Sequence, residues 1–379
     1  MTSALYLDYN ATTPVAPEVA DAMEPYLREH FGNPSSSHRF GQQARAAVEQ
    51  ARGQVAGLIG VDTDEIVFTS CATEANNLAI LGAARALHGR GRHLITSAIE
   101  HPAVAAPMAH LTEQGWEVTV LPVDATGRVA PADLAGALRG DTVLVSVMHA
   151  NNEVGTLQPI AELAGLARQR GALFHTNAAQ SAGKVALDAA ALRVDLLTLA
   201  GHKFYAPKGI GALYVRAGTP LAPVLFGAGQ ERGLRPGTEN VPHIVGLGAA
   251  AERVRQQLPE ITGRLRRQRD ALHGRLAEAI PGLVLNGHAE DRLPNTLNLA
   301  FPGVSGRDLL ARAPEVAASV GSACHEGAGA VSGVLGAMGV TPERARGAVR
   351  LSIGEPTGDD DIEAAAQALI GAWRGLFSV

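Results

Sequence analysis

Short apolar segments alternate with segments of helical periodicity over most of this 379-residue chain. Four of them, at 65–70 (EIVFTS), 93–97 (HLITS), 142–148 (TVLVSVM) and 172–176 (ALFHT), have the length and composition of buried strands. Helical segments separate them. This alternation predicts βα units and an α/β fold with a mostly parallel sheet that helices cover. Such sheets bind ligands at the carboxyl ends of their strands.

The pattern changes after residue 240, where a long charged amphipathic segment at 250–280 predicts a connecting helix. This helix leads into a second, smaller α+β unit, and we expect Pro259 to break or kink it. Because no flexible linker is evident, the two units should pack tightly. We expect residues 12–256 to form the large domain, and residues 1–11 with 257–379 to form the small one.

The composition excludes several classes of protein. A net charge of −5 disfavours a nucleic-acid binder. No apolar run is long enough to span a membrane, and the N-terminus MTSALYLDYN lacks the regions of a secretory signal, so we expect a cytoplasmic chain without a membrane partner. Only two cysteines occur, Cys71 and Cys324, too few for a cysteine-only metal cluster or a disulfide framework, and we expect no metal site.

Polar residues that are suited to chemistry follow the predicted strands. In TSCATEANN, Thr73 opens a helix whose free backbone N–H groups can hold a phosphate, although threonine is also a common structural N-cap. Lys203 follows the strand at 196–200, where it is either a surface lysine or the amine that forms a Schiff base with a carbonyl cofactor. The other strand-end residues are His101, Asn151, Asn152, Asn177 and Gln180. Together these motifs predict one shared site.

The sequence resembles the cysteine desulfurase family, the class V aminotransferase branch of the pyridoxal-phosphate enzymes. The resemblance runs nearly from end to end through motifs in this order: YLDYNATTP, FGNPSSSH, FTSCATEANN, AIEHPAV, HANNEVGTLQPI, HTNAAQSAGK, GHKFYAPKGIGALYVR, GQERGLRPGTEN, NTLNL, SVGSACH and AVRLSIG. Within the family, GHKFY, FGAGQERGLRPGTEN and ASVGSACH are closer to the selenocysteine lyases than to the desulfurases of iron–sulfur cluster assembly.

This resemblance implies a fold of the aspartate aminotransferase type (fold type I), with a seven-stranded, mostly parallel sheet in the large domain. It implies pyridoxal 5′-phosphate as the cofactor, a homodimer as the assembly, and a sulfur-acceptor protein as a partner. The substrate would be L-cysteine or L-selenocysteine. The small domain would carry the loop with the catalytic cysteine.

The resemblance also implies a role for each matching residue. Lys203 would bind the cofactor and act as a catalytic base, His101 would stack on the ring, and Gln180 would contact the ring hydroxyl. The remaining cofactor-binding residues would be Thr73, Asn152, Asn177, His202 and, from the other subunit, Thr238. Asn152 and Arg350 would hold the substrate carboxylate, with Asn10 nearby, because the planar fork of an arginine binds a carboxylate through two parallel hydrogen bonds.

Cys324 lies in a glycine-rich stretch, SVGSACHEGAGAVSG, which favours a mobile loop over a buried packing site. By resemblance, its thiolate attacks the substrate sulfur and forms a persulfide, and alanine leaves. The neighbouring His325 lowers the pKa of the thiol if it is protonated.

Three positions depart from the family pattern. Asn177 stands where the family usually has an aspartate that pairs with the protonated ring nitrogen, and Asn carries no charge for that pairing. Either turnover is slowed or the asparagine bonds an unprotonated nitrogen. Ala200 replaces a phosphate-binding serine of the cluster-assembly desulfurases, which costs one donor at most. Cys71 replaces a glycine, and we interpret it as a tolerated small residue rather than a second sulfur acceptor.

Three functions follow as hypotheses. The first is a cysteine desulfurase that loads Cys324 with persulfide. The second is a selenocysteine lyase that releases selenide and alanine, in which Cys324 discriminates between substrates. The third is a non-catalytic or impaired cofactor-binding homologue, which Asn177 favours and the presence of Lys203, His101, Gln180, Arg350 and Cys324 disfavours. An aminotransferase would not need Cys324.

Overall fold

A seven-stranded sheet forms the centre of the larger unit in the computed structural model, which describes residues 4–320 and 332–377. The strands lie in this spatial order: β2 (Ile66–Thr69), β8 (Gly211–Val215), β7 (Leu196–Ala200), β6 (Leu173–Asn177), β5 (Thr142–Ser146), β3 (His93–Ser97) and β4 (Glu117–Leu121). β8 is antiparallel to both of its neighbours, and the pairs from β7 to β4 are parallel. The prediction of a mostly parallel sheet of seven strands is confirmed.

The antiparallel direction of β8 has a local cause. Residues 201–210 connect β7 to β8 without a crossover helix, and a connection this short joins antiparallel strands, whereas parallel neighbours need a longer crossover. This connection begins with the 3-10 helix η2 (Gly201–Lys203), so it holds Lys203 at the carboxyl end of a central strand.

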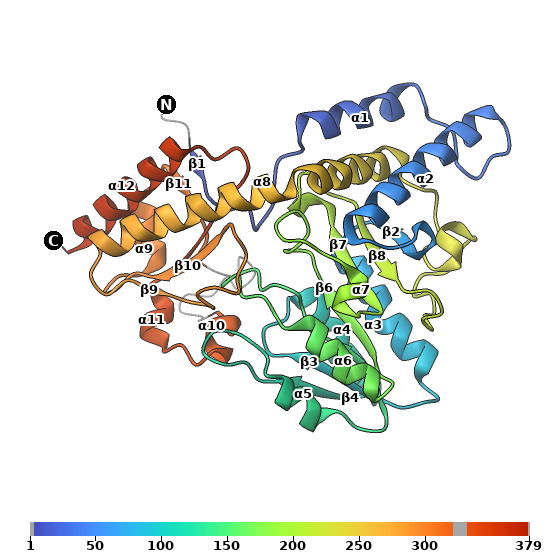
Figure 1. The fold of residues 1–379 in the computed structure, drawn as a ribbon, viewed down its shortest axis with the longest axis horizontal. Coiled ribbons are helices and arrows are strands. Elements are labelled where there is room, and N and C mark those ends of the chain that lie inside the picture. The colour runs from blue at the N-terminus through green and yellow to red at the C-terminus, as the bar shows by residue number, and fades with distance from the viewer. Residues whose placement is uncertain (1–3, 321–331, 378–379) are drawn as a thin grey trace.

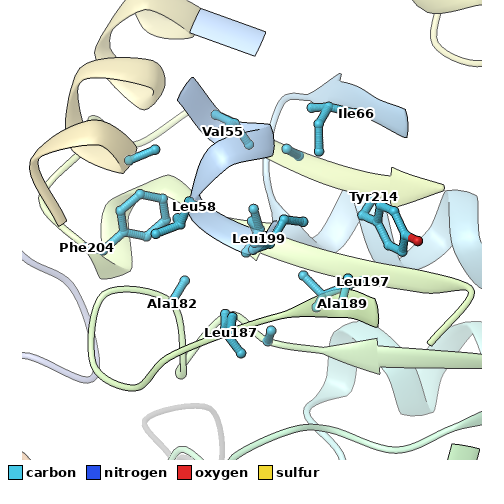
Figure 2. Packing of buried hydrophobic residues seen from close by; sticks show 14 of the residues in the cluster. Val55, Leu58, Ile66, Ala182, Leu187, Ala189, Leu197, Leu199, Phe204 and Tyr214 are labelled. Atoms are coloured by element: carbon cyan, nitrogen blue, oxygen red, sulfur yellow. The ribbon is translucent and has the colours of Figure 1, made fainter. Parts of the chain in front are cut away.

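Helices cover both faces of the large sheet. The helices in this part of the chain are α1 (Pro17–Arg28), α2 (Arg39–Ile59), α3 (Ala72–Leu87), α4 (Pro102–Glu113), α5 (Pro131–Ala137), α6 (Ile160–Gln169) and α7 (Ala189–Leu192), with the 3-10 helices η1 (Thr63–Glu65) and η3 (Gln230–Gly233). On one face, Val55 and Leu58 of α2 pack over Leu197 and Leu199 of β7 and beside Phe204 (Figure 2). On the other face, α3 and α4 bury a second apolar cluster. The large unit therefore has three layers.

The smaller unit contains a three-stranded antiparallel sheet, in the order β12-β10-β9, and a two-stranded parallel sheet. Its elements are β1 (Leu5–Tyr6), β9 (Val284–Leu285), β10 (Thr296–Ala300), β11 (Val316–Ala317), β12 (Ala348–Ser352), α9 (Gly306–Arg312), α10 (Gly333–Ala337), α11 (Pro342–Arg346) and α12 (Asp359–Leu376). The N-terminal strand β1 pairs with β11, so Leu5 and Tyr6 belong to this C-terminal unit.

Helix α8 (Val241–Ala279) joins the two units and runs across the molecule from one to the other (Figure 1). The break expected at Pro259 is wrong, because the helix continues through this residue. Pro259 is exposed, and the backbone hydrogen bond that it removes is outweighed by the burial of Val254 and Ile261 on either side.

Two apolar cores divide the chain near the middle of α8. Val254 belongs to the core of the large unit, whereas Ile261 and Leu7 belong to the core of the small one. These cores support the domain limits 12–256 and 1–11 with 257–379, which stay a proposal. Among the described residues, no helix is both long and apolar enough to cross a membrane.

Candidate active site

A cavity of about 200 Å³ opens where five strands of the large sheet end. Its wall contains residues that follow β2, β3, β5, β6 and β7, as expected for the carboxyl edge of a parallel sheet. Nine residues that sequence analysis discussed line it, namely Cys71, Thr73, His101, Asn152, Asn177, Gln180, Ala200, His202 and Lys203. The structure thus brings these strand-end residues together at one site.

Lys203 is held at the cavity by backbone oxygens of the N-terminal segment. Its Nζ donates to the carbonyl of Asn10 at 2.6 Å and to that of Ala11 at 2.8 Å. Burial, followed by the positive charge of Arg350, lowers the pKa of Lys203 to about 8, against an opposing effect of Asp8. A lysine with this pKa has a substantial fraction of neutral amine near pH 7 to 8, and the neutral amine is the form that attacks a carbonyl group.

The two histidines at the cavity are neutral. Nδ1 of His101 accepts a hydrogen bond from the backbone N–H of Ala103 at 3.1 Å, so the ring proton lies on Nε2. Burial and then the charge of Lys203 lower the pKa of His101. Burial and nearby lysines lower the pKa of His202 to about 4, and its Nδ1 lies 3.1 Å from the hydroxyl of Thr12. An uncharged ring suits stacking on an aromatic ligand.

Asn177 ends β6 with its side chain buried in the cavity wall. Its Oδ1 accepts a hydrogen bond from the backbone N–H of Ala179 at 3.1 Å. Because an N–H can only donate, the oxygen of the amide is fixed on that side, and Nδ2 is the remaining donor. The geometry favours donation to an unprotonated ring nitrogen, which is one of the two readings that the sequence left open.

Arg350 and Asn10 lie behind the cavity and do not line it. Nη2 of Arg350 forms an ion pair with Asp8 at 2.6 Å, and Nη1 donates to the carbonyl of Asn152 at 3.1 Å. Nε of Arg350 is buried and has no partner in the described part of the chain. Arg350 therefore already holds one carboxylate, and its remaining free N–H is buried.

Thr238 is exposed and lies outside the cavity of its own chain. Its loop is nevertheless fixed to the start of α3, because Arg235 Nε donates to Glu74 at 2.8 Å and Glu74 accepts from the backbone N–H of Ser70. The same loop is anchored to α2 by a buried bidentate pair between Arg52 and Glu231.

Cys324 lies outside the described residues, and both flanks of its segment contact residues that adjoin Asn152 of the cavity wall. Ser319 and Arg350 exchange two backbone hydrogen bonds, at 3.3 and 2.7 Å. Ser332 donates to Glu153, the residue after Asn152, at 2.5 Å.

Comparison with known proteins identifies the family. The profile of the family described as Aminotransferase class-V matches residues 5–364. This chain belongs to that family. Cysteine desulfurase IscS of Dictyoglomus turgidum is 46% identical over 364 residues, which cover 96% of this chain and 92% of the relative. Cysteine desulfurase 2 of Trichormus variabilis is 47% identical over 97% of this chain and 92% of its own length.

Solved structures agree with this class-V aminotransferase assignment. A structure titled NifS-like protein has a TM-score of 0.92 and 36% identity, with coverage of 99% of this chain and 100% of its own. The structure titled SspA in complex with cysteine has a TM-score of 0.83 and 38% identity, with coverage of 92% of this chain and 98% of its own. The prediction of fold type I is confirmed, and pyridoxal phosphate is the cofactor of this family and of this chain.

The residues at the cavity fit pyridoxal phosphate. Helix α3 begins at the cavity with no side-chain hydrogen bond to its first turn, so backbone N–H groups beside Thr73 are available to a phosphate. Asn76, one turn further on, lines the cavity and is fully buried, and both atoms of its amide lack a partner among the described residues. Buried polar atoms are nearly always hydrogen-bonded, so this orphaned amide indicates a polar ligand.

Sequence reasoning missed three residues of the site. Asn76 follows Thr73 by three positions and hence shares its helix face, a spacing that could have revealed it. Lys184 lies in the motif HTNAAQSAGK, four residues after Gln180, and contacts its side chain. Asp8 lies in YLDYNATTP, and only the fold shows that it pairs with Arg350.

Proposed function

We propose that this chain is a pyridoxal-phosphate-dependent cysteine desulfurase that converts L-cysteine into L-alanine and transfers the sulfur to Cys324 as a persulfide. The observation that carries the proposal is the position of Lys203, whose pKa is about 8, in a cavity with His101, Asn177 and Gln180. The reported relatives named cysteine desulfurase favour this activity over the selenocysteine lyase that some motifs suggested.

The residues at the cavity would hold the cofactor in a defined way. Thr73 and the start of α3 would bind the phosphate with His202, and His101 would lie against the ring. Gln180 and Asn177 would donate to the ring oxygen and to the ring nitrogen. When it is bound at Lys203, pyridoxal phosphate supplies an electron sink for the bonds at the substrate Cα.

The chain's own groups then move the protons and the sulfur. Arg350 and Asn152 hold the substrate carboxylate, and Lys203 Nζ takes the proton from Cα. The thiolate of Cys324 attacks the substrate sulfur. Over the whole cycle the sulfur–Cβ bond breaks and a sulfur–sulfur bond forms at Cys324. Cβ takes up the proton that the thiol of Cys324 released, and Cα regains the proton that Lys203 removed, which gives alanine.

Variants at the two cysteines test the sulfur transfer. After reaction with L-cysteine, Cys324→Ala is expected to bind cofactor with the normal absorbance, to release no alanine and to carry no persulfide detectable by mass spectrometry. Cys71→Ala is the matched control, and its persulfide should map to Cys324. A Cys324→Ala protein that releases alanine from cysteine at the wild-type rate would contradict the proposal. Retained activity towards selenocysteine alone would indicate the lyase.

A second candidate is an impaired homologue, which Asn177 favours because its amide cannot pair with a protonated ring nitrogen as a carboxylate does. The alanine assay separates this candidate from the first, since an impaired homologue would bind pyridoxal phosphate and release no alanine from either substrate.

We also propose a homodimer that works in the cytoplasm and passes sulfur to an acceptor protein. The exposed Thr238 supports the dimer, because a second copy could bring it to the phosphate. Phe226, 80% exposed on the loop before η3, would then be buried. Sedimentation analysis of the holoenzyme should give twice the mass of the chain, and a monomer would overturn this part of the proposal.

A further inference from the structure

Lys184 is a buried lysine next to the cavity that the proposed reaction does not use. It is 5% exposed, and Gly183, with a φ of 78°, turns the chain immediately before it. A Cβ at Gly183 would lie 2.5 Å from Cβ of Phe204, so this tight turn requires glycine. The turn places Lys184 in the interior.

Both hydrogen-bond partners of the Lys184 side chain are neutral amide oxygens. Nζ donates to Oε1 of Gln180 at 2.9 Å and to Oδ1 of Asn10 at 3.2 Å. The charged groups that act on it are the cations Lys203 and Arg350, and Asp8 is paired with Arg350. Burial first, and then these two cations, lower the pKa of Lys184 well below its usual range. What the geometry shows directly is that Lys184 donates hydrogen bonds to two amide oxygens.

Two contacts, with Lys184 and with the carbonyl of Asn10, fix which way the amide of Gln180 faces. Oε1 is occupied by the lysine, so Nε2 lies on the other side, where it donates to the carbonyl of Asn10 at 2.9 Å. That same carbonyl accepts from Nζ of Lys203. Because an amide NH₂ has two hydrogens, Gln180 keeps one N–H, and its side chain lines the cavity.

We propose that Lys184 is a positioning residue that fixes Gln180 so that an N–H, and not a carbonyl oxygen, faces the ring oxygen of the cofactor. This inference rests on the proposed function, in which Gln180 contacts that oxygen. A donated hydrogen bond stabilises the anionic form of the oxygen. Without it the oxygen draws the proton on the neighbouring Lys203 nitrogen more strongly, and the pKa of that nitrogen rises.

The test is a pH titration of the visible absorbance of the holoenzyme for four proteins: wild type, Lys184→Met, Gln180→Ala and the double variant. The pH midpoint of the absorbance change reports the pKa of the Lys203 nitrogen. Lys184→Met is expected to raise this midpoint by about one pH unit, which is the effect of losing one hydrogen bond to a charged group. Gln180→Ala should raise it similarly, and the double variant should show no further rise, because the lysine acts through the glutamine.

Two results would overturn the inference. One is a folded Lys184→Met protein with the wild-type midpoint. The other is a double variant whose shift is the sum of the two single shifts, which would mean that Lys184 acts through its charge. Thr262→Val is the matched control: Thr262 Oγ1 donates to the backbone carbonyl of Lys184 at 2.9 Å, so this variant disturbs the residue but not its side chain, and its midpoint should not move.

Thermal unfolding of each protein without cofactor reports whether it folds. If Lys184→Met does not fold, Lys184→Gln replaces it among the four proteins. The shorter amide cannot reach both oxygens, so its midpoint should also rise. The readout is separate from cysteine turnover. Shifted midpoints in a chain that releases no alanine would overturn the proposed function and support this inference. Alanine release with unshifted midpoints would support the proposed function and overturn this inference.

Discussion

At the scale of single residues, Asn177 makes a backbone contact that either an asparagine or an aspartate can make. Unlike an aspartate, it brings no negative charge to the cavity. An aspartate could accept the same hydrogen bond from Ala179 and still carry a charge towards the ring nitrogen. The resemblance to the family implies an aspartate at this position. A protonated ring nitrogen makes the cofactor a stronger electron sink, so the asparagine should limit the rate of proton removal by Lys203.

We therefore expect Asn177→Asp to increase the rate of alanine release from L-cysteine. The gain should be at least about tenfold, because one hydrogen bond to a charged group is worth more than 1.4 kcal/mol. Steady-state measurement of alanine under saturating cysteine checks this value. An unchanged or slower rate in a variant that binds the cofactor normally would contradict the hypothesis.

The lowered pKa of Lys203 predicts how cofactor uptake depends on pH. As the pH falls below 8, the fraction of neutral amine that can attack the aldehyde falls towards a tenth per pH unit, and the rate of uptake by the cofactor-free protein should fall with it. Above pH 8 the rate should level off. Stopped-flow absorbance between pH 6 and pH 9.5 measures it, and Lys203→Ala should show no binding band. A plateau that extends down to pH 6 would contradict the assigned pKa.

Residue identities at the strand ends could be predicted because each motif is local in sequence and the carboxyl edge of a parallel sheet collects them. Pairing between distant segments could not. Asp8 meets Arg350, and Asn10 meets Lys184, only after β1 has joined the C-terminal unit. The burial that lowers the pKa of Lys184 is likewise a property of the fold, since the motif alone leaves a lysine exposed by default.

At the scale of elements, the loop after β8 is held by the buried pair of Arg52 and Glu231, whose side chains are 6% and 3% exposed. Glu231 Oε2 also accepts from the backbone N–H of Phe68 at 2.7 Å. Glu231 and Arg232 have φ values of 46° and 56°, which is a strained conformation for residues with a side chain. The pair compensates for this strain and ties the loop with Thr238 to β2 and α2.

Glu231→Gln should lower the free energy of unfolding by about 3 kcal/mol, because it leaves a buried guanidinium without a counter-charge. Urea unfolding followed by circular dichroism measures the loss. The control is Glu252→Gln at the exposed i,i+3 pair with Arg255, which should not move the urea midpoint. Equal losses of unfolding free energy in the two variants would show that burial does not set the strength of the pair between Arg52 and Glu231.

Strands β2, β3, β5, β6 and β7 could be predicted from their short apolar runs, whereas the continuity of α8 could not. Pro259 is a local signal for a break, and the opposing signal is the packing of both halves of the helix against two different cores. Tertiary burial of this kind overrides a local preference and has no signature within a short window of sequence.

At the scale of the whole molecule, buried histidines make the fold sensitive to acid. Burial lowers the pKa of His175 to about 3 and that of His149 to about 4. The unfolded chain takes up protons at these residues below pH 6.5 and the folded chain does not. Stability is therefore fully present above pH 6.5 and is lost as the pH falls towards 3. Glu100, whose pKa burial raises to about 7, acts in the opposite direction as the pH rises from 4.5 to 7.

We expect the free energy of unfolding to fall between pH 6.5 and pH 3, with up to about 4 kcal/mol from His175. Urea titrations at several pH values measure this slope. His175→Gln should reduce the slope, since glutamine can still bond to the hydroxyls of Ser146 and Thr198 but does not titrate. A variant with the wild-type slope would exclude His175 as the acid-sensitive group.

Helix α8 has a consequence for how substrate reaches the site. One unbroken 39-residue helix is built into both cores, so rotating one unit against the other would require bending or melting it at the boundary near Pro259. The continuous helix therefore makes an opening rotation of the two units costly in free energy. The angle between the two units should then stay unchanged when an amino acid enters and alanine leaves. Movements of side chains and short segments at the rim of the cavity would admit the substrate and release the product.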